Sequence, residues 1–386
     1  MGLRSDLMRS TTPEYSANAL SDVLPSALAA LGVPGETDTL GLGAAFDGVD
    51  RVVILLIDGL GHHLYPRAAV ASTVLSDVVA GHRGSLRRLT TGFPSTTPTS
   101  LAGLATGATP GQHGILGFTV NVPETDRMLV HIQWNDDPAP NDWQPHPTCF
   151  ERAAAVGVRG HMVDAFSAGL SKAIYRGAVH HHAADVAQLR RGVNEALKSP
   201  GPAVVMAYYP GVDKAGHLFG VGSPQWHAEV ALIDGLLEGL LADLGSDTAL
   251  LVTADHGMID VPETSRIRME NTPTLRDGVR LIGGEPRARY VYTEPGAADE
   301  VAATWRDVLG EYADVVTRAE VVAAGWFGPV VPAHLPRIGD LVVVCRDDYA
   351  LFGAPEADSP IVDRLPGLHG GLTEAEMAVP LWTARG

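Results

Sequence analysis

Four short segments each place an Asp or a His beside a glycine at the end of an apolar run. Their candidate ligands are Asp58 in LLIDGLG, Asp213 and His217 in VDKAGH, Asp255 and His256 in TADHGM, and His369 in LPGLHGG. Carboxylates and imidazoles without cysteine suit Zn²⁺, Mn²⁺ or Fe ions. Six such ligands are too many for one tetrahedral ion, so the economical division is two ions with three ligands each. Two ions about 3.5–4 Å apart can clamp the attacking and leaving oxygens of a displacement at phosphorus.

Each of these segments is a weak signal by itself. A lone Asp58-Gly59 pair is more typical of a turn than of a metal site. Asp213 and His217 are four residues apart, which places them on one face of a helical turn, as two ligands of one ion require. Adjacent Asp255 and His256 can both reach an ion only from a turn, which the glycine after them permits.

A stretch rich in hydroxyl groups, FPSTTPTSLAGLATG at residues 93–107, supplies a candidate nucleophile. A helix cap needs only one of its Ser and Thr side chains, and capping or solvation accounts for most of them. A metal ion lowers the pKa of a coordinated hydroxyl, so that a Thr can attack as an alkoxide near neutral pH. The N-terminus of a helix adds partial positive charge where a phosphoryl oxygen would rest.

The elements that must position these residues alternate along the chain. Residues 51–57, 203–209 and 248–254 are continuous apolar runs, as expected of buried parallel strands. Residues 185–199 and 223–245 have the spacing of amphipathic helices. This alternation predicts an α/β fold whose central sheet is mostly parallel and flanked by helices. Because ligands bind beyond the carboxyl ends of such strands, we expect the four segments to meet there.

A change in composition after Met258 suggests a second part of the chain. We expect residues 1–261 and 346–386 to form the catalytic α/β core, and residues 262–345 to form a smaller α+β insertion, a cap. The elements expected around this insertion are a strand at 287–293, a helix at 298–310 and a strand at 339–352.

Composition restricts the partners and the location. The formal net charge of −17 disfavours nucleic-acid binding, and a small anionic substrate would need local cations. Cys149 and Cys345 lie outside any CxxC pattern, so no disulfide framework is expected. The first 20 residues contain no apolar signal-peptide core, and no apolar run reaches membrane-spanning length. We therefore expect a cytoplasmic protein with no membrane partner.

In their order along the chain, the segments DG, FPSTTPTSLAGLATG, DKAGH, ADHGM and HGG resemble the alkaline phosphatase superfamily. The resemblance is strongest to the nucleotide pyrophosphatase/phosphodiesterase (type I phosphodiesterase) family and runs from about residue 50 to 382. It implies an alkaline-phosphatase-like fold, two zinc ions and a threonine nucleophile. The family pattern places this nucleophile ten residues before the glycine of Thr106-Gly107, which is Thr97.

The resemblance also implies a role for each candidate. One zinc would be bound by Asp213, His217 and His369, and the other by Asp58, Asp255 and His256 together with Thr97. In the family mechanism Thr97 attacks phosphorus, a zinc-bound hydroxide hydrolyses the phospho-threonine, and the second zinc stabilises the leaving oxygen. Ser100 stands where the family often has an asparagine that donates to the phosphoryl oxygen, so Ser100 is expected to donate with a shorter reach.

The implied activity is hydrolysis of phosphodiester or pyrophosphate bonds in a small phosphate ester, such as a nucleotide. Two alternatives stay open: a phosphonate or phosphomonoester hydrolase on the same site, and a non-catalytic, metal-bound protein that binds a nucleotide. Tyr208 and Tyr209 precede Asp213 and either stack on a base or aryl group or belong to the core. The sequence does not indicate an oligomeric state.

Overall fold

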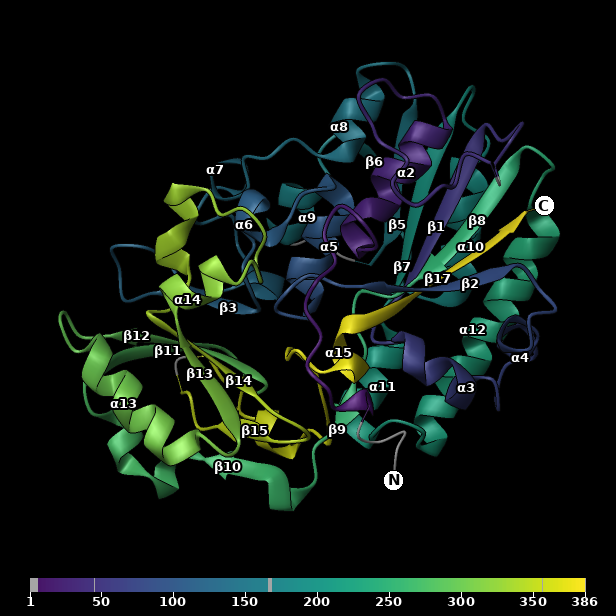
Figure 1. Cartoon of the computed structure of the whole chain (residues 1–386). Coiled ribbons are helices and arrows are strands. Elements are labelled where there is room, and N and C mark those ends of the chain that lie inside the picture. The colour runs from purple at the N-terminus through teal and green to yellow at the C-terminus, as the bar shows by residue number, and fades with distance from the viewer. Residues whose placement is uncertain (1–5, 45, 166–168, 356, 386) are drawn as a thin grey trace.

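The computed structural model describes residues 6–44, 46–165, 169–355 and 357–385. Its largest element is a seven-stranded sheet in the order β2-β17-β8-β1-β7-β5-β6 (Figure 1). The strands are β1 (Arg51–Ile57), β2 (Ser85–Thr90), β5 (Arg159–Asp164), β6 (Ala178–His182), β7 (Ala203–Tyr209), β8 (Thr248–Thr253) and β17 (Ala378–Arg385). Only β17 runs antiparallel to its neighbours, β2 and β8. The predicted α/β fold with a mostly parallel sheet is confirmed.

The three predicted apolar strands lie side by side at the centre of this sheet. In β1, β7 and β8 nearly every side chain is buried, which explains why their sequences are continuously apolar. Ile57 is level with Tyr209, and Leu56 is level with Thr253, so the three strands end at one edge. The segments that follow these strands are the ones that carry Asp58, Asp213 and Asp255.

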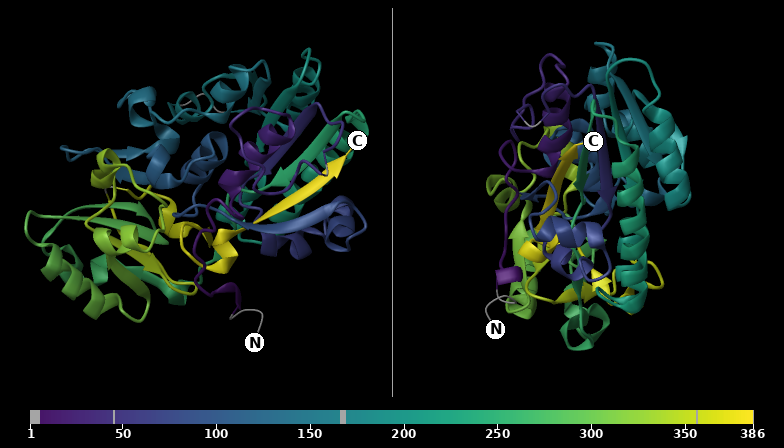
Figure 2. Two further views of the ribbon diagram at one scale, coloured as in Figure 1. Left: turned by 45° about the horizontal axis from the view of Figure 1, so that its top comes forward. Right: turned by 90° about the vertical axis from the view of Figure 1, so that its right-hand side faces the viewer.

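Helices cover both faces of the sheet. Figure 2 (right) shows the purple helix α2 (Val23–Ala30) on one side of the sheet and the long α12 (Pro224–Asp243) on the other. The amphipathic α10 (Val186–Ala196) packs against α12 and β7. The hydroxyl of Ser223 caps α12 by accepting the backbone N–H of Trp226 at 3.1 Å. The helices predicted at 185–199 and 223–245 are confirmed.

A second, four-stranded antiparallel sheet lies beside the first (Figure 1). Its order is β11-β12-β14-β13, formed by β11 (Val279–Glu285), β12 (Ala288–Thr293), β14 (Leu341–Cys345) and β13 (Ala313–Thr317). The helix α13 (Ala298–Leu309) packs against β13 and buries Trp305 in a separate apolar cluster. All of these elements fall within the expected insertion, whose role as a cap stays a prediction.

The single strand predicted at 339–352 is wrong. The chain forms β14, turns at 346–349 with Asp347 in the left-handed region (φ 43°), and continues as β15 (Ala350–Phe352). The short β15 pairs with β10 (Arg266–Arg268) instead of extending β14. Consecutive polar residues, Arg346 to Asp348, favour a turn here over a longer buried strand.

The remaining α-helices and strands in the described residues are short. They are α3 (Tyr65–Ala68), α4 (Thr73–Val79), α5 (Thr97–Thr106), α6 (Pro110–His113), β3 (Thr119–Asn121), β4 (Met128–Val130), α7 (Pro140–Trp143), α8 (Cys149–Ala154), α9 (Gly169–Ile174), α11 (Gly211–Phe219), β9 (Ile259–Asp260), α14 (Arg318–Ala323), β16 (Gly367–Leu368) and α15 (Glu374–Met377).

A buried ion pair joins the second sheet to α15, the helix that precedes β17. Arg287, just before β12, donates to Glu376 of α15 through Nη2 at 2.7 Å and through Nε at 3.0 Å, and both side chains are fully buried. Glu376 also accepts the backbone N–H of Gly371 and the hydroxyl of Thr373. The loop between His369 and β17 is therefore held from the side of the second sheet.

Candidate active site

The first group of candidate ligands comprises Asp58, Asp255 and His256, all buried at the ends of β1 and β8. Nε2 of His256 lies 3.4 Å from Oδ1 of Asp58 and 3.5 Å from Oδ2 of Asp255. Asp255 is oriented through its other oxygen, which accepts the backbone N–H groups of Gly59 and His256 at 3.1 Å each. One ligand atom from each residue lies within 4.8 Å of the others, a spacing that fits one metal ion.

The second group comprises Asp213 and His217 on α11 and His369 after β16. Nε2 of His217 lies 3.5 Å from Oδ2 of Asp213 and 3.2 Å from Nε2 of His369. The ligand atoms of these three residues also lie within 4.8 Å of one another. The helix gives Asp213 and His217 their common face, as their spacing predicts.

The two groups adjoin each other. The rings of His256 and His369 stack with their centroids 3.7 Å apart. Gly59 allows Asp213 to approach the loop after Asp58, because a Cβ on Gly59 would lie 2.9 Å from the Cβ of Asp213. Gly59 also has a φ of 69°, which other residues rarely adopt. The predicted convergence of the four segments is what the fold produces.

Backbone carbonyls orient all three imidazoles. Nδ1 of His217 lies 2.7 Å from the carbonyl of Gly367, and Nδ1 of His369 lies 2.9 Å from that of Ser95. Nδ1 of His256 lies 3.0 Å from the carbonyl of Gly257. Because a carbonyl only accepts, each Nδ1 carries the proton, and each Nε2 presents a lone pair to the cluster. Metal-binding histidines are commonly held in this way.

The electrostatics of the two groups favour bound cations. Burial, and then the charges of Asp255 and Asp213, raise the pKa of Asp58 well above its usual range. Burial also raises the pKa of Asp213, although His217 and His256 oppose this. Burial and the neighbouring His256 and His217 lower the pKa of His369 well below its usual value.

Each of the three carboxylates also has one buried oxygen without a hydrogen-bond partner among the described residues: Oδ1 of Asp58, Oδ1 of Asp213 and Oδ2 of Asp255. Buried polar atoms are rarely left in this state. The Nε2 lone pairs of His217 and His369, which face each other at 3.2 Å, would repel without a cation between them. The residues therefore fit a pair of divalent ions.

Thr97 is the first residue of α5, and its hydroxyl faces the first group. Its Oγ1 lies 3.2 Å from Nε2 of His256. The neighbouring hydroxyls are bonded elsewhere: Thr96 donates to Oε2 of Glu285 at 3.1 Å, and Ser95 donates to the carbonyl of Gly371 at 2.7 Å. Of these three consecutive hydroxyls, only that of Thr97 faces the Asp/His groups, and its role as the nucleophile stays a prediction.

Ser100 lies apart from this arrangement. Its hydroxyl is buried and shares a hydrogen bond of 2.8 Å with the hydroxyl of Thr91. It lines a small separate cavity with Tyr15 and Gly103, and it is not among the described residues that line the cavity beside Thr97. Its role as a catalytic donor stays a prediction, and none of these contacts supports it.

A cavity of about 630 Å³ opens onto the two groups. Five of the predicted site residues line it: Asp58, Thr97, Asp213, His217 and His369. The region around β3 and β4 contributes Phe118, Val130, Ile132 and Gln133. The turn between β11 and β12 of the second sheet contributes residues 284–286, and the loop after β15 contributes residues 357–360, 362 and 365. Asp255 and His256 are buried beneath it.

Three further residues contact the candidate ligands or line the cavity beside them, and these contacts were not predicted from the sequence. Glu285 is buried, lies 3.6 Å from Nδ1 of His369, and burial raises its pKa well above the usual value. Its sequence context, an acidic residue after two glycines at a strand end, is similar to that of the predicted ligands.

Tyr208 is buried, lines the cavity and donates its hydroxyl to Asp58. Lys214 also lines the cavity. Tyr209 is partly buried, with its hydroxyl bonded to Glu229.

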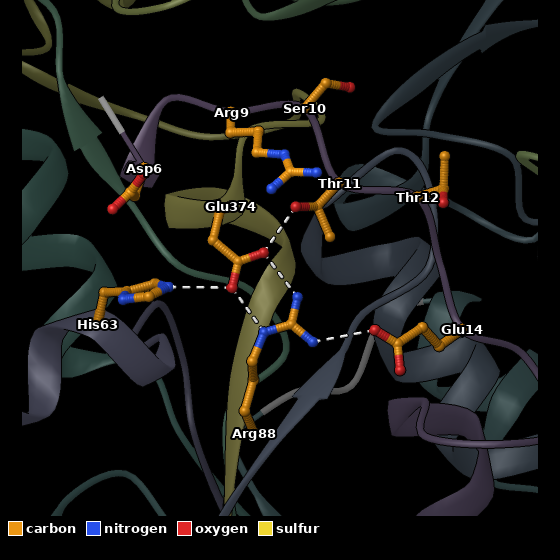
Figure 3. A pocket seen from close by; sticks show the side chains of 9 residues that line it. All are labelled: Asp6, Arg9, Ser10, Thr11, Thr12, Glu14, His63, Arg88 and Glu374. Atoms are coloured by element: carbon orange, nitrogen blue, oxygen red, sulfur yellow. Dashed lines mark hydrogen bonds and ion pairs between the residues drawn. The ribbon is translucent and has the colours of Figure 1, made fainter. Parts of the chain in front are cut away.

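A second cavity, of about 560 Å³, contains none of the predicted site residues (Figure 3). At its centre the carboxylate of Glu374 accepts hydrogen bonds from Arg88 at 2.5 and 2.6 Å and from Thr11 at 2.6 Å. His63 lies 3.2 Å from the same carboxylate, and Arg88 reaches Glu14 at 3.1 Å. This network ties the N-terminal segment to the loops that follow Asp58 and His369.

In the part of the chain that the structure describes, every helix is too short or too polar to cross a lipid bilayer.

A mostly parallel sheet with two Asp/His triads at its carboxyl edge is typical of a metal-dependent hydrolase. The sequence profile described as Type I phosphodiesterase / nucleotide pyrophosphatase matches residues 52–371, and the chain belongs to this family. The predicted family and enzyme class are thereby confirmed.

Solved structures share the fold. Murine ectonucleotide pyrophosphatase/phosphodiesterase 5 is 16% identical with a TM-score of 0.68, covering 86% of this chain and 87% of that one. Phosphonoacetate hydrolase from Sinorhizobium meliloti 1021, in complex with phosphonoformate, is 20% identical with a TM-score of 0.66, covering 86% and 89%. An inactive threonine-to-alanine form of the murine protein is known in complex with AMP.

A shorter sequence match connects the chain to the catalytic subunit of GPI ethanolamine phosphate transferase 3 from mouse and from human. Each is 38% identical over 55 residues, which is 14% of this chain. The chain spans only 5% of the length of these relatives. The match is therefore local.

Proposed function

We propose that this enzyme hydrolyses phosphodiester or pyrophosphate bonds with two zinc ions and with Thr97 as the nucleophile. The observation that carries the proposal is the adjacency of two Asp/His triads, whose His256 and His369 stack at 3.7 Å, with the Thr97 hydroxyl 3.2 Å from Nε2 of His256. Both the family membership and the buried unpartnered carboxylate oxygens support it.

Each triad would hold one ion: Asp58, Asp255 and His256 the first, and Asp213, His217 and His369 the second. Zinc suits three-coordinate Asp/His sets that leave a position open, and Mn²⁺ or Fe would suit them also. When bound, the ions supply positive charge that lowers the pKa of the Thr97 hydroxyl and polarises the phosphoryl group.

Thr97 would form a covalent intermediate. The bond from its Oγ1 to phosphorus forms as the bond from phosphorus to the leaving oxygen breaks, and water then cleaves the phospho-threonine. The N-terminus of α5, where Thr97 stands, would direct backbone N–H groups toward the phosphoryl oxygens. The inactive threonine-to-alanine form of the murine phosphodiesterase, with its bound AMP, supports this role and a nucleotide-like substrate.

The second sheet would act as a cap over the substrate. Gly284, Glu285 and Pro286, at the turn after β11, line the cavity together with metal-site residues. Phosphonate hydrolysis on the same site is the second candidate function, supported by the shared fold of phosphonoacetate hydrolase. In that reaction the bond that breaks would be the carbon–phosphorus bond.

We also propose a cytoplasmic location. Both cysteines, Cys149 and Cys345, are free and buried. Unpaired cysteines are typical of a reducing compartment, which supports this location.

The proposed function is tested with metal-stripped protein to which zinc is returned. Turnover of bis(p-nitrophenyl) phosphate should appear with zinc and disappear with chelator, and it should exceed the turnover of p-nitrophenyl phosphate. Carbon–phosphorus cleavage of phosphonoacetate that exceeds both would favour the second candidate. Zinc-loaded protein that turns over none of these substrates would overturn both.

A matched pair of variants tests the nucleophile. Thr97→Ala should abolish turnover and leave two bound zinc ions, as measured by metal analysis. Thr99→Ala is the control, because the Thr99 hydroxyl lies on the same helix with no hydrogen-bond partner among the described residues. Equal activity in the two variants would rule out Thr97 as the nucleophile.

A further inference from the structure

Lys214 lies in the helix that carries two candidate ligands. It follows Asp213 directly on α11, and His217 comes three residues later. Its side chain is exposed and lines the same cavity as Thr97 and His369. Among the described residues that line this cavity, it has the only Lys or Arg side chain.

Among the described residues, no hydrogen bond or ion pair involves the ammonium group of Lys214. The chain has two other lysines, and each has a carboxylate partner: Lys172 pairs with Asp136, and Lys198 lies 2.7 Å from Glu195. An unpaired lysine is notable in a chain of net charge −17, because carboxylates are plentiful.

The remaining acids around the cavity are already engaged. Asp358 pairs with the buried Arg289 at 2.7 Å and accepts the backbone N–H of Ala354 at 3.0 Å. Glu285 accepts the hydroxyl of Thr96. Asp58 and Asp213 belong to the triads. Lys214 is therefore free to bind an anion that enters the cavity.

We propose that Lys214 is a specificity residue that binds a second anionic group of the substrate, beside the phosphoryl group that reacts. This inference rests on the proposed function, because the two triads hold the reacting group. It defines the substrate class as phosphoryl compounds that carry another negative charge close to the scissile bond. A lysine ammonium donates charge-assisted hydrogen bonds to such oxygens.

Two kinds of molecule supply this chemistry. In a pyrophosphate the second anion is a phosphate, and in a phosphonocarboxylate it is a carboxylate. Inorganic pyrophosphate and phosphonoacetate represent the two kinds. Orthophosphate and methylphosphonate are the matched probes that lack the second anion.

The test is binding to the zinc-loaded Thr97→Ala protein, measured by isothermal titration calorimetry, with and without Lys214→Met. The protein should bind at least one of the two probes that carry a second anionic group, pyrophosphate or phosphonoacetate, more tightly than its matched probe. Lys214→Met should reduce this preference about tenfold or more, the usual loss for a hydrogen bond to a charged group. Lys214→Arg should retain most of this preference. Lys198→Met is the control and should leave the preference unchanged, because Lys198 is exposed just after α10.

If Lys214→Met loses the preference for pyrophosphate over orthophosphate, the second anion is a phosphate. If it loses the preference for phosphonoacetate over methylphosphonate, the second anion is a carboxylate. The inference is overturned if neither pyrophosphate nor phosphonoacetate is preferred over its matched probe, or if Lys214→Met and Lys198→Met leave the same preference. Circular dichroism and zinc content show whether each variant is folded and loaded. Because this readout is binding, a preference lost in Lys214→Met would uphold the inference even if the wild-type enzyme turned over no ester.

Discussion

The hydroxyl of Tyr208, the penultimate residue of β7, donates a hydrogen bond to Oδ2 of Asp58, which follows the neighbouring β1. This contact leaves Oδ1 of Asp58 directed toward His256 with no hydrogen-bond partner among the described residues. Such contacts fix the orientation of a ligand, and losing one typically costs about 10–100-fold in metal affinity.

Tyr208→Phe should therefore weaken zinc binding by about 10–100-fold at the site that contains Asp58. Competition with a chromophoric chelator measures this loss. Tyr209→Phe is the control, because that hydroxyl is bonded to Glu229. Equal zinc affinity in the two variants would contradict a positioning role for Tyr208.

The ion pair between Arg287 and Glu376 should be a major determinant of stability. Glu376→Gln would leave a buried guanidinium uncompensated, which commonly costs about 3–5 kcal/mol. Urea unfolding measures the free energy. Glu195→Gln, which breaks the exposed pair with Lys198, should change stability little by comparison. If Glu376→Gln lowered the free energy of unfolding as little as Glu195→Gln does, the ion pair would not be a major determinant of stability.

The network around Glu374 should make stability sensitive to acid. Burial raises the pKa of Glu374, but the hydrogen bonds from Arg88, His63 and Thr11 outweigh burial and hold it well below the usual value. A carboxyl group whose pKa is lowered by folding stabilises the protein fully above its unfolded pKa, about 4.3, and this stabilisation is lost as the pH falls further.

The difference in unfolding free energy between the wild type and Glu374→Gln should therefore be constant from about pH 7 to 5.5 and shrink below about pH 4.5. Urea unfolding at several pH values gives this difference. A difference that stays constant or widens in acid would mean that Glu374 is not stabilised as its contacts indicate.

The parts of the site that could be predicted from the sequence are those encoded within short, continuous segments of the chain. Continuous apolar runs identified β1, β7 and β8, and the parallel arrangement of these strands brings Asp58, Asp213 and Asp255 to one edge. The choice of Thr97 over Thr96 came from the family pattern, because hydrogen-bond partners that lie far away in the sequence distinguish the two hydroxyls.

The contacts that could not be predicted from the sequence join segments that are far apart along the chain. Glu285 meets Thr96 only because the second sheet lies against the start of α5, and Arg287 meets Glu376 only because that sheet also lies against the segment after His369. Ser100 is three residues after Thr97, which is compatible with one helix face, yet its hydroxyl is bonded to Thr91. A pattern along one helix cannot reveal a partner on another segment.

The central claim is that the two triads hold a pair of ions beside Thr97, and anomalous diffraction from zinc-loaded crystals tests it most directly. The account predicts two peaks at the zinc absorption edge, one bordered by Asp58, Asp255 and His256 and the other by Asp213, His217 and His369. The Thr97 hydroxyl should face the first peak. A single peak, peaks outside the triads, or a Thr97 hydroxyl turned away from both would contradict the account.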